Sequence, residues 1–202
     1  VVGAGISGIA AVDLLTEAGA YVTLYDGNKE LKEEEIRAKF SCEFTGRFVF
    51  GEFTEELKAE TELLVMSPGV PVDLPFVEDL KKAGVPVIGE IELAYLFSKG
   101  KIVAITGTNG KTTTTALTGE IMRTFFSNVL VVGNIGTPYT SLVQTTDEDS
   151  VTVAEISSFQ LETVDTFRPD VSMILNITPD HLNRHHTMEE YVRVKESVAK
   201  NQ

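Results

Sequence analysis

Residues 102–114 read IVAITGTNGKTTT, an apolar run that passes into a Gly/Thr/Asn loop and closes on Lys111 and Thr112. This order of strand, glycine loop, Lys-Thr and helix is what the binding of a nucleoside triphosphate needs. Glycines let backbone N–H groups approach the phosphates, and a helix N-terminus adds positive charge. Lys111 can reach the β- and γ-phosphates, and the Thr112 hydroxyl can ligate Mg²⁺. A strict G-x-x-x-x-G-K-[ST] loop needs glycine where Ile105 stands, so the pattern predicts a shorter phosphate loop. The alternative is a plain strand–helix turn with an incidental lysine.

The composition is that of a globular protein with an acidic surface. The chain has 202 residues, 43% of them hydrophobic and 23% charged, and a formal net charge of -13. This charge repels nucleic acid and anionic membranes, and no apolar run approaches the roughly 18 residues of a membrane span, so we expect neither partner. The single cysteine, Cys42, cannot form an intrachain disulfide, which fits a reducing, cytoplasmic compartment.

The first residues are typical of a dinucleotide-binding unit. Residues 1–8 read VVGAGISG, a strand end followed by G-x-G-x-x-G, and a second strand ends in Asp26, 18 positions after Gly8. The pattern predicts a Rossmann-like start with Asp26 on a ribose hydroxyl. UDP-sugars also contain ribose and diphosphate, so the motif does not select NAD, and a tight turn that needs small residues is the alternative. Residues 67–69 (SPG) follow a predicted strand, which indicates either a ligand-binding strand end or a simple turn.

A short polar stretch divides the chain. Residues 98–100 (SKG) lie directly before the strand of the phosphate loop. We therefore expect an α/β protein with a Rossmann-like N-terminal domain over residues 1–98 and a P-loop α/β central domain over residues 99–202. Because the chain starts at Val1, just before the glycine motif, and ends after a helical pattern without a stop signal, we interpret it as a fragment.

Polar residues follow three predicted strands of the second half. Strands over 129–132, 151–154 and 171–177 lead to the GNIG sequence of 133–136, to Glu155 and to His181. A carboxylate at a strand tip near a phosphate loop can hold Mg²⁺, although it can also be a solvated strand end. His181 could ligate a metal, act as a base or lie on the surface.

Four motifs in order resemble the Mur ligases of bacterial cell-wall synthesis: residues 106–114, residues 133–136, residues 155–162 (EISSFQLE), and Asp180-His181 followed by Tyr191-x-x-x-Lys195. The second and third motifs favour the D-glutamate-adding members, whereas the N-terminal G-x-G-x-x-G is shared with the L-alanine-adding members. The resemblance implies a monomeric cytoplasmic enzyme that uses ATP and Mg²⁺. Such an enzyme joins D-glutamate to UDP-N-acetylmuramoyl-L-alanine through an acyl phosphate, in peptidoglycan precursor synthesis.

The resemblance also implies residue roles. Catalysis would involve Lys111, His181 and Lys195, and the nucleotide would contact Gly107, Thr108, Asn109, Gly110, Lys111, Thr112 and Thr113. The UDP substrate would contact Ile6, Ser7, Asp26, Ser67, Pro68, Gly69, Asn134, Ser157 and Gln160. One Mg²⁺ would be held by Thr112 and Glu155, and a second by His181 and by Lys195 if that lysine is carbamylated.

Other functions stay open at this point. An L-alanine-adding ligase is the nearest alternative. An NAD-dependent oxidoreductase would use residues 3–8 and Asp26 but leaves the second glycine loop unexplained. A binding module could hold ATP without ligase chemistry. The D-glutamate contacts of the family lie in a third domain, which would follow Gln202, so we expect residues 1–202 to bind substrates weakly without turnover.

Overall fold

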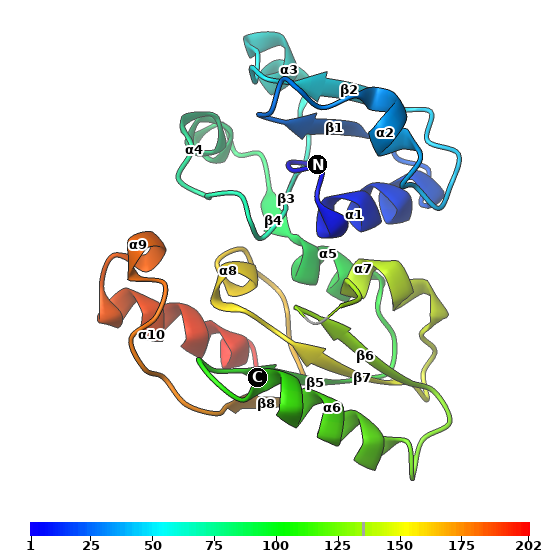
Figure 1. Ribbon diagram of the computed structural model, residues 1–202, viewed down its shortest axis with the longest axis vertical. Helices are drawn as coiled ribbons and strands as arrows, with labels where there is room; N and C mark the ends of the chain where they lie inside the picture. Colours follow the sequence, from blue (N-terminus) through cyan, green and yellow to red (C-terminus); the bar gives the residue numbers. More distant parts are fainter. Residues whose placement is uncertain (135) are drawn as a thin grey trace.

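Two parallel sheets form the two tiers of the protein in a computed structural model, which describes residues 1–134 and 136–202 (Figure 1). In the first sheet β1 (Thr23–Asp26) pairs with β2 (Arg47–Phe50), and β3 (Leu64–Met66) pairs with β4 (Val87–Gly89). Val2 makes parallel bridges to Tyr25 of β1 and Met66 of β3, so it joins the two pairs. Around this sheet lie α1 (Ile6–Glu17), α2 (Glu33–Arg37), α3 (Glu55–Glu60) and α4 (Pro75–Lys82).

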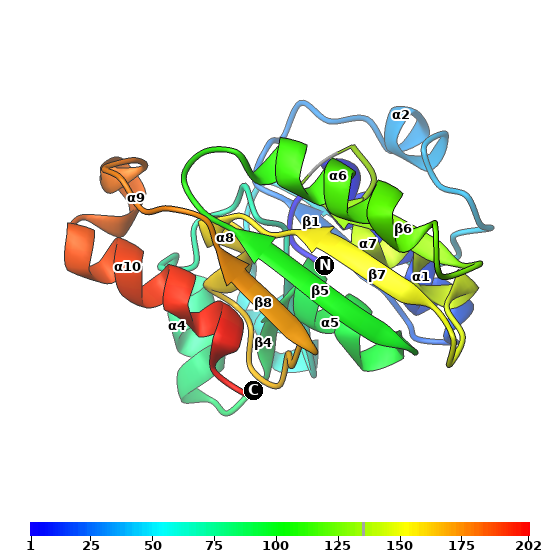
Figure 2. The ribbon, with the colours of Figure 1, turned by 90° about the horizontal axis from the view of Figure 1, so that it is seen from below.

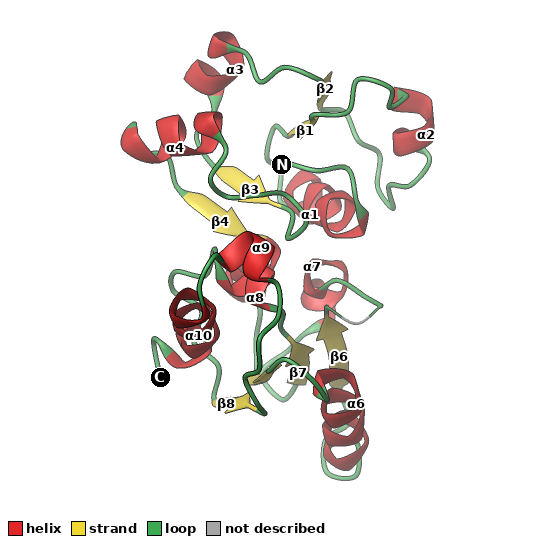
Figure 3. Ribbon diagram, turned by 60° about the vertical axis from the view of Figure 1, so that its left-hand side comes forward, coloured by secondary structure: helices red, strands yellow, loops and turns green. Residues whose placement is uncertain are grey.

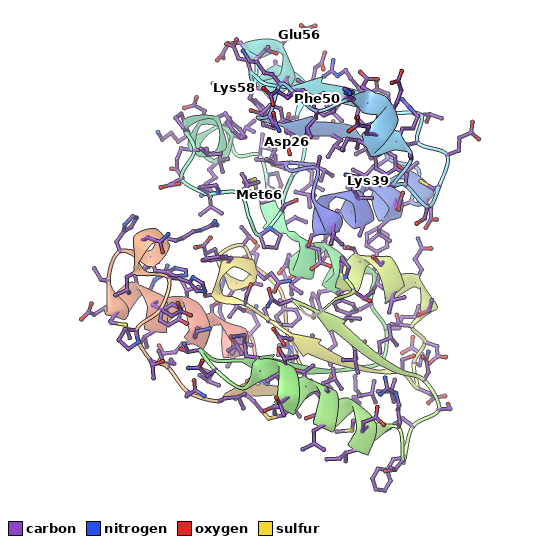
Figure 4. The ribbon with its side chains drawn as sticks, in the orientation of Figure 1. Asp26, Lys39, Phe50, Glu56, Lys58 and Met66 are labelled. Atoms are coloured by element: carbon purple, nitrogen blue, oxygen red, sulfur yellow. The ribbon has the colours of Figure 1, made fainter. Side chains whose placement is uncertain are left out.

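The helix ends of this tier follow local sequence signals. The Thr54 hydroxyl accepts a hydrogen bond from Leu57 N at 3.2 Å and so caps α3. Helix α4 starts with Pro75, whose missing N–H costs nothing in a first turn, and Gly84 follows it with a φ of 81°. Figure 4 marks Asp26 on β1 and Met66 on β3, both in the upper tier.

The second sheet has the strand order β6-β7-β5-β8, all parallel. Figure 2 shows α6 (Lys111–Met122) on one face of this sheet, with α5 (Glu90–Phe97) and α10 (Met188–Glu196) on the other. The strands are β5 (Lys101–Thr106), β6 (Val129–Gly133), β7 (Val151–Glu155) and β8 (Val171–Ile174). Short helices are α7 (Tyr139–Leu142), α8 (Ser158–Leu161) and α9 (Leu182–His185), with 3-10 turns at Val143–Thr145 and Ser197–Ala199.

One hydrophobic core connects the tiers. Ala11 and Leu14 of α1 belong to the same buried cluster as Ile91 of α5 and Ile102 of β5. Figure 1 shows α5 and α7 between the two sheets, and α7 is seen there again in Figure 3. Helix α1 contacts them both. Burial of this shared apolar surface, at roughly 25 cal/mol per Å², holds the two tiers against one another.

The α/β class predicted from the sequence is confirmed, and the strands expected over 129–132 and 151–154 are present with one added residue each. The strand predicted over 171–177 ends at Ile174, because Asn176 turns aside to bond the phosphate loop. Ile135 of the GNIG sequence lies outside the described residues. None of the helices in the described ranges combines the length and the apolar character of a membrane span.

Candidate active site

The sequence at 107–113 forms a backbone cradle between β5 and α6. Gly107 and Gly110 have φ values of 146° and 82°, in the left-handed region where a side chain would be strained. Gly110 is the residue from which α6 starts, and the first turn of α6 carries no acidic side chain. The N–H groups of a first turn have no carbonyl partner within their own helix. The cradle therefore offers N–H donors and partial positive charge to an anion.

Residues that follow β8 hold this cradle in shape. Asn176 accepts from Asn109 N and donates back to Asn109 O, both at 2.9 Å, and its carbonyl accepts from Thr108 N at 3.0 Å. The Thr108 hydroxyl lies 3.1 Å from the Tyr191 hydroxyl. Lys111 extends along the loop and donates its Nζ proton to Thr108 O at 2.9 Å. The loop is thus preformed, and Asn176 is a supporting residue that the sequence analysis missed.

Glu155 at the end of β7 connects the cradle to the neighbouring strand tip. Its Oε2 accepts from the Thr112 hydroxyl and its Oε1 accepts from Asn134 Nδ2, each at 2.8 Å. The carboxylate is only 2% exposed. Because β7 lies between β5 and β6, the parallel register brings the three residues to one edge of the sheet. Thr112 and Glu155, which the resemblance assigns to one Mg²⁺, are in direct contact, and their role in metal binding stays a prediction.

These two residues suit one Mg²⁺ ion bound together with a nucleotide. A hydroxyl and a carboxylate are oxygen ligands of the kind that Mg²⁺ prefers. The described part of the chain contains no group of three or more His, Cys, Asp or Glu residues arranged for a metal ion. A cation at Thr112 and Glu155 would therefore complete its shell with water and phosphate oxygens, which is how Mg²⁺ commonly binds nucleotides.

His181 lies on the surface near the same edge. Its side chain is 48% exposed, and its Nε2 is 3.4 Å from Asp180 Oδ2. The ring lies against Phe159, with centroids 4.8 Å apart. The backbone φ of 51° is unusual for a residue with a side chain, and it lets the chain turn into α9 at this position. A role for His181 in metal binding stays a prediction.

Lys195 is buried beneath the phosphate loop, with 1% of its surface exposed. Its Nζ donates to Gly107 O at 3.0 Å and to the Thr106 hydroxyl at 3.3 Å, and it lies over the ring of Tyr191. Burial, and then the charge of Lys111, lower the pKa of Lys195 to about 8. As an ammonium group it cannot ligate a metal, so that role depends on its chemical modification.

A cleft of about 480 Å³ lies where the carboxyl ends of both sheets meet. All the residues predicted for the UDP substrate line it except Ser157, which lies beside it and caps α8 through a hydrogen bond with Gln160 N. The cleft is formed by Gly3, Ala4, Gly5, Ile6, Ser7, Asp26, Ser67, Pro68, Gly69, Val70, Gly133, Asn134, Gly136, Pro138 and Gln160. The two halves of the chain therefore share one site.

The wall contributed by the first tier is a second glycine loop. Asp26 accepts from Ala4 N at 2.8 Å and from Asn28 N at 2.9 Å, so both its oxygens hold backbone in place. A Cβ on Gly8 would come within 1.8 Å of Gly3 O, which is why the turn requires glycine there. The structure gives Asp26 this positioning role, which the sequence did not predict.

An ion-pair network that the sequence analysis also missed joins the tiers beside the cleft. Arg184 donates to both carboxylate oxygens of Glu162 and, at 3.0 Å, to Val70 O. His185, left without a role by its sequence context, is buried with Nε2 3.0 Å from the Ser158 hydroxyl, and burial lowers its pKa. No sequence signal marks Arg184 or His185, because their partners lie far away along the chain.

Comparison with known proteins agrees with this geometry. The family description "Mur ligase MurD-like, N-terminal domain" matches residues 1–89, and "Mur ligase middle domain" matches residues 105–202. The chain belongs to the Mur ligase family. The family resemblance read from the four motifs is thus confirmed.

Curated Mur ligases of high identity cover the chain completely. A UDP-N-acetylmuramoylalanine--D-glutamate ligase of Lachnoclostridium phytofermentans is 62% identical over 202 residues, which are 100% of this chain and 44% of that protein. The Lachnospira eligens protein of the same name is 59% identical over 202 residues, again 100% of this chain and 45% of its own length. The chain therefore spans less than half the length of these relatives.

Solved Mur ligases share the fold. The crystal structure of UDP-N-acetylmuramate-alanine ligase MurC from Thermotoga maritima aligns with 99% of this chain and 46% of its own, with a TM-score of 0.53 and 24% identity. A UDP-N-acetylmuramate:L-alanyl-gamma-D-glutamyl-meso-diaminopimelate ligase from Neisseria meningitides aligns with 99% of this chain and 66% of its own, with a TM-score of 0.54 and 17% identity. At these identities the likeness concerns the arrangement of the Mur ligase domains alone.

Proposed function

We propose that this chain is the substrate- and ATP-binding part of a ligase that joins D-glutamate to UDP-N-acetylmuramoyl-L-alanine. The observation that carries the proposal is the position of Glu155, which bonds Thr112 of the phosphate loop and Asn134 of the cleft at 2.8 Å each. A carboxylate bridging the two sites suits a reaction between a phosphate and a group held in the cleft. The names of the relatives at 62% and 59% identity support D-glutamate as the second substrate.

The proposed reaction has two steps, a phosphoryl transfer and an acyl transfer. A carboxylate oxygen of the alanine attacks the γ-phosphorus of ATP and ADP leaves, which gives an acyl phosphate. The neutral amine of D-glutamate then attacks the acyl carbon, and inorganic phosphate leaves with its bonding pair, while the nitrogen releases one proton and keeps one hydrogen in the new amide. Phosphoryl transfer depends mainly on positioning and on neutralising charge. Mg²⁺, when bound, supplies part of that positive charge.

We propose that the second tier binds ATP and the first cation, and that the first tier binds the UDP end of the substrate. We assign the phosphates to Lys111 and to the backbone donors of residues 107–113, and the first cation to Thr112 and Glu155. The UDP end belongs to the glycine loop at 3–8 and to residues 67–69. For Ser157 and Gln160 we propose contacts to the arm of the substrate or its diphosphate.

The second cation site that we propose requires a chemical change at Lys195. A neutral amine is needed for a lysine to take up CO₂, and a pKa of about 8 leaves part of Lys195 neutral near physiological pH. Carbamylation would turn it into a carboxylate-like ligand beside the phosphate loop, with His181 as the second donor. We also place the boundary between the two domains at residues 98–99, where the chain leaves α5 and enters β5.

Phosphate release by the whole protein tests the proposal. We expect release to require ATP, Mg²⁺, UDP-N-acetylmuramoyl-L-alanine and D-glutamate together. Release with UDP-N-acetylmuramate and L-alanine would instead identify an L-alanine-adding ligase. NADH binding without any response to UDP-sugars would refute both. The variant Glu155→Gln should lose most activity, whereas Glu60→Gln, a change at an exposed ion pair with Arg47, should be neutral.

A further inference from the structure

Glu90, the first residue of α5, is a buried acid that the proposed mechanism does not use. It is 1% exposed. Its Oε1 accepts from the backbone N of Thr140 at 2.8 Å and from the Thr140 hydroxyl at 3.1 Å, and its Oε2 faces Gln160 Nε2 at 3.5 Å. Burial raises the pKa of Glu90, and the hydrogen bonds from Thr140 oppose that change. A buried acid with three donors aimed at it has a defined structural task.

The partners of Glu90 belong to the wall of the cleft. Gln160 lines the cleft directly, and Pro138, which also lines it, immediately precedes α7 with its Thr140. Glu90 itself follows β4 of the first sheet. One carboxylate therefore ties the first tier to two elements of the second, and both elements shape the substrate site.

The hydrogen bonds also determine which way the Gln160 amide faces. Gln160 Oε1 accepts from Ser157 N at 2.9 Å and from the Ser157 hydroxyl at 3.0 Å. Because the Ser157 N–H can only donate, the amide oxygen must face Ser157, and the NH₂ group is the end that faces Glu90. In this orientation the carbonyl is used by Ser157, and the amide has a second N–H beyond the one that faces Glu90.

We propose that Glu90 is a positioning residue that locks the Gln160 amide so that it presents an N–H donor, not a carbonyl, to an anionic oxygen of the ligand in the cleft. This inference rests on the proposed function, in which that ligand is the UDP-sugar substrate and carries phosphate and carboxylate oxygens. The same carboxylate holds Thr140 at the start of α7, two residues after Pro138 of the cleft.

Two single variants and their combination test the lock. E90Q places a second NH₂ group opposite Gln160, so donor meets donor unless the Gln160 amide turns over and abandons Ser157. Q160E places a second carboxylate beside Glu90 in a buried position. In the double variant E90Q/Q160E the new amide donates to the new carboxylate, which still accepts from Ser157. We expect both single variants to lower the melting temperature and the double variant to recover most of the loss.

Ligand affinity separates positioning from a merely structural role. In the whole protein, measured by calorimetry, E90Q should weaken UDP-N-acetylmuramoyl-L-alanine binding by about tenfold, the effect of one lost hydrogen bond to a charged group. ATP affinity should stay within twofold, because the phosphate loop contains none of these residues. The double variant should not regain substrate affinity, since position 160 then lacks an N–H donor. The exposed change E60Q is the control and should alter neither affinity.

Several results would overturn the inference. Equal losses of ATP and substrate affinity in E90Q would show a general structural defect, and unchanged substrate affinity would remove the positioning role. A double variant as unstable as the sum of the singles would refute the donor–acceptor match. If the wild-type protein failed to bind the UDP-sugar at all, the proposed function would fail, and the melting temperatures of the four proteins would still decide the Glu90–Gln160 lock.

Discussion

Glu92, two residues after Glu90 in α5, makes the strongest stability prediction in this structure. It is 2% exposed and accepts four hydrogen bonds from the chain that follows α8. Oε2 accepts from Asp165 N at 2.8 Å and Phe167 N at 3.0 Å, while Oε1 accepts from Thr166 N at 2.7 Å and from the Thr166 hydroxyl. The backbone N–H groups of residues 165–167 therefore donate to the carboxylate of Glu92, where those of a strand would donate to carbonyl groups of a neighbouring strand.

The expected cost of Glu92→Ala follows from these contacts. Three backbone N–H groups would lose their acceptor, at roughly 1–3 kcal/mol each where they stay buried. Removing the desolvated carboxylate returns part of that loss. We therefore expect the free energy of unfolding to fall by about 4 kcal/mol, a large effect for one substitution. In Glu92→Gln at most half of the stabilisation by the Glu92 hydrogen bonds should remain, because either orientation of the amide turns its NH₂ group toward two donors.

Urea denaturation, followed by circular dichroism, measures the effect. With a slope of about 2 kcal/mol per molar urea, a loss of about 4 kcal/mol moves the midpoint down by roughly 2 M. Glu120→Ala is the matched control, since that side chain is 72% exposed and pairs with Arg123 one turn away. Its urea midpoint should stay within about 0.3 M of wild type. A Glu92→Gln protein as stable as wild type would refute the reasoning, because it would mean that one acceptor oxygen is enough.

Two further predictions concern the glycine turn and the buried lysine. Gly8→Ala should unfold the first loop and abolish UDP-sugar binding in calorimetry, because the added Cβ would lie 1.8 Å from Gly3 O. The control Gly27→Ala, whose added Cβ would lie 3.8 Å from the Tyr25 hydroxyl, should bind the UDP-sugar normally. Normal binding by Gly8→Ala would contradict the packing argument. The pKa of Lys195 falls from 10.5 to about 8 on folding, so below pH 8 both states hold the proton and between pH 8 and 10.5 only the unfolded state does. The free energy of unfolding of the wild type should therefore rise by about 3 kcal/mol across that window relative to Lys195→Met. Urea midpoints at each pH measure this difference, and parallel pH profiles of the two proteins would exclude the lowered pKa of Lys195.

The sequence already contained the order of the elements and the location of both glycine turns. The glycines at 3, 8, 107 and 110 could be read locally, because a turn that needs a left-handed residue or a close backbone approach restricts its own sequence. Glu155 and Asn134 could be anticipated at one sheet edge, since parallel strands place their carboxyl ends together.

Only the tertiary structure decided what the acids and bases do. Glu90 and Glu92 are two of 30 acidic residues, and nothing local distinguishes them from a solvated helix face. Their burial depends on donors that lie 50 positions later at Thr140 and 73 to 75 positions later at Asp165 to Phe167. In the same way Lys195 becomes a buried cation because the phosphate loop, 88 positions earlier, covers it. A turn is specified by its own residues, whereas the environment of a charge is specified by whatever the fold packs around it.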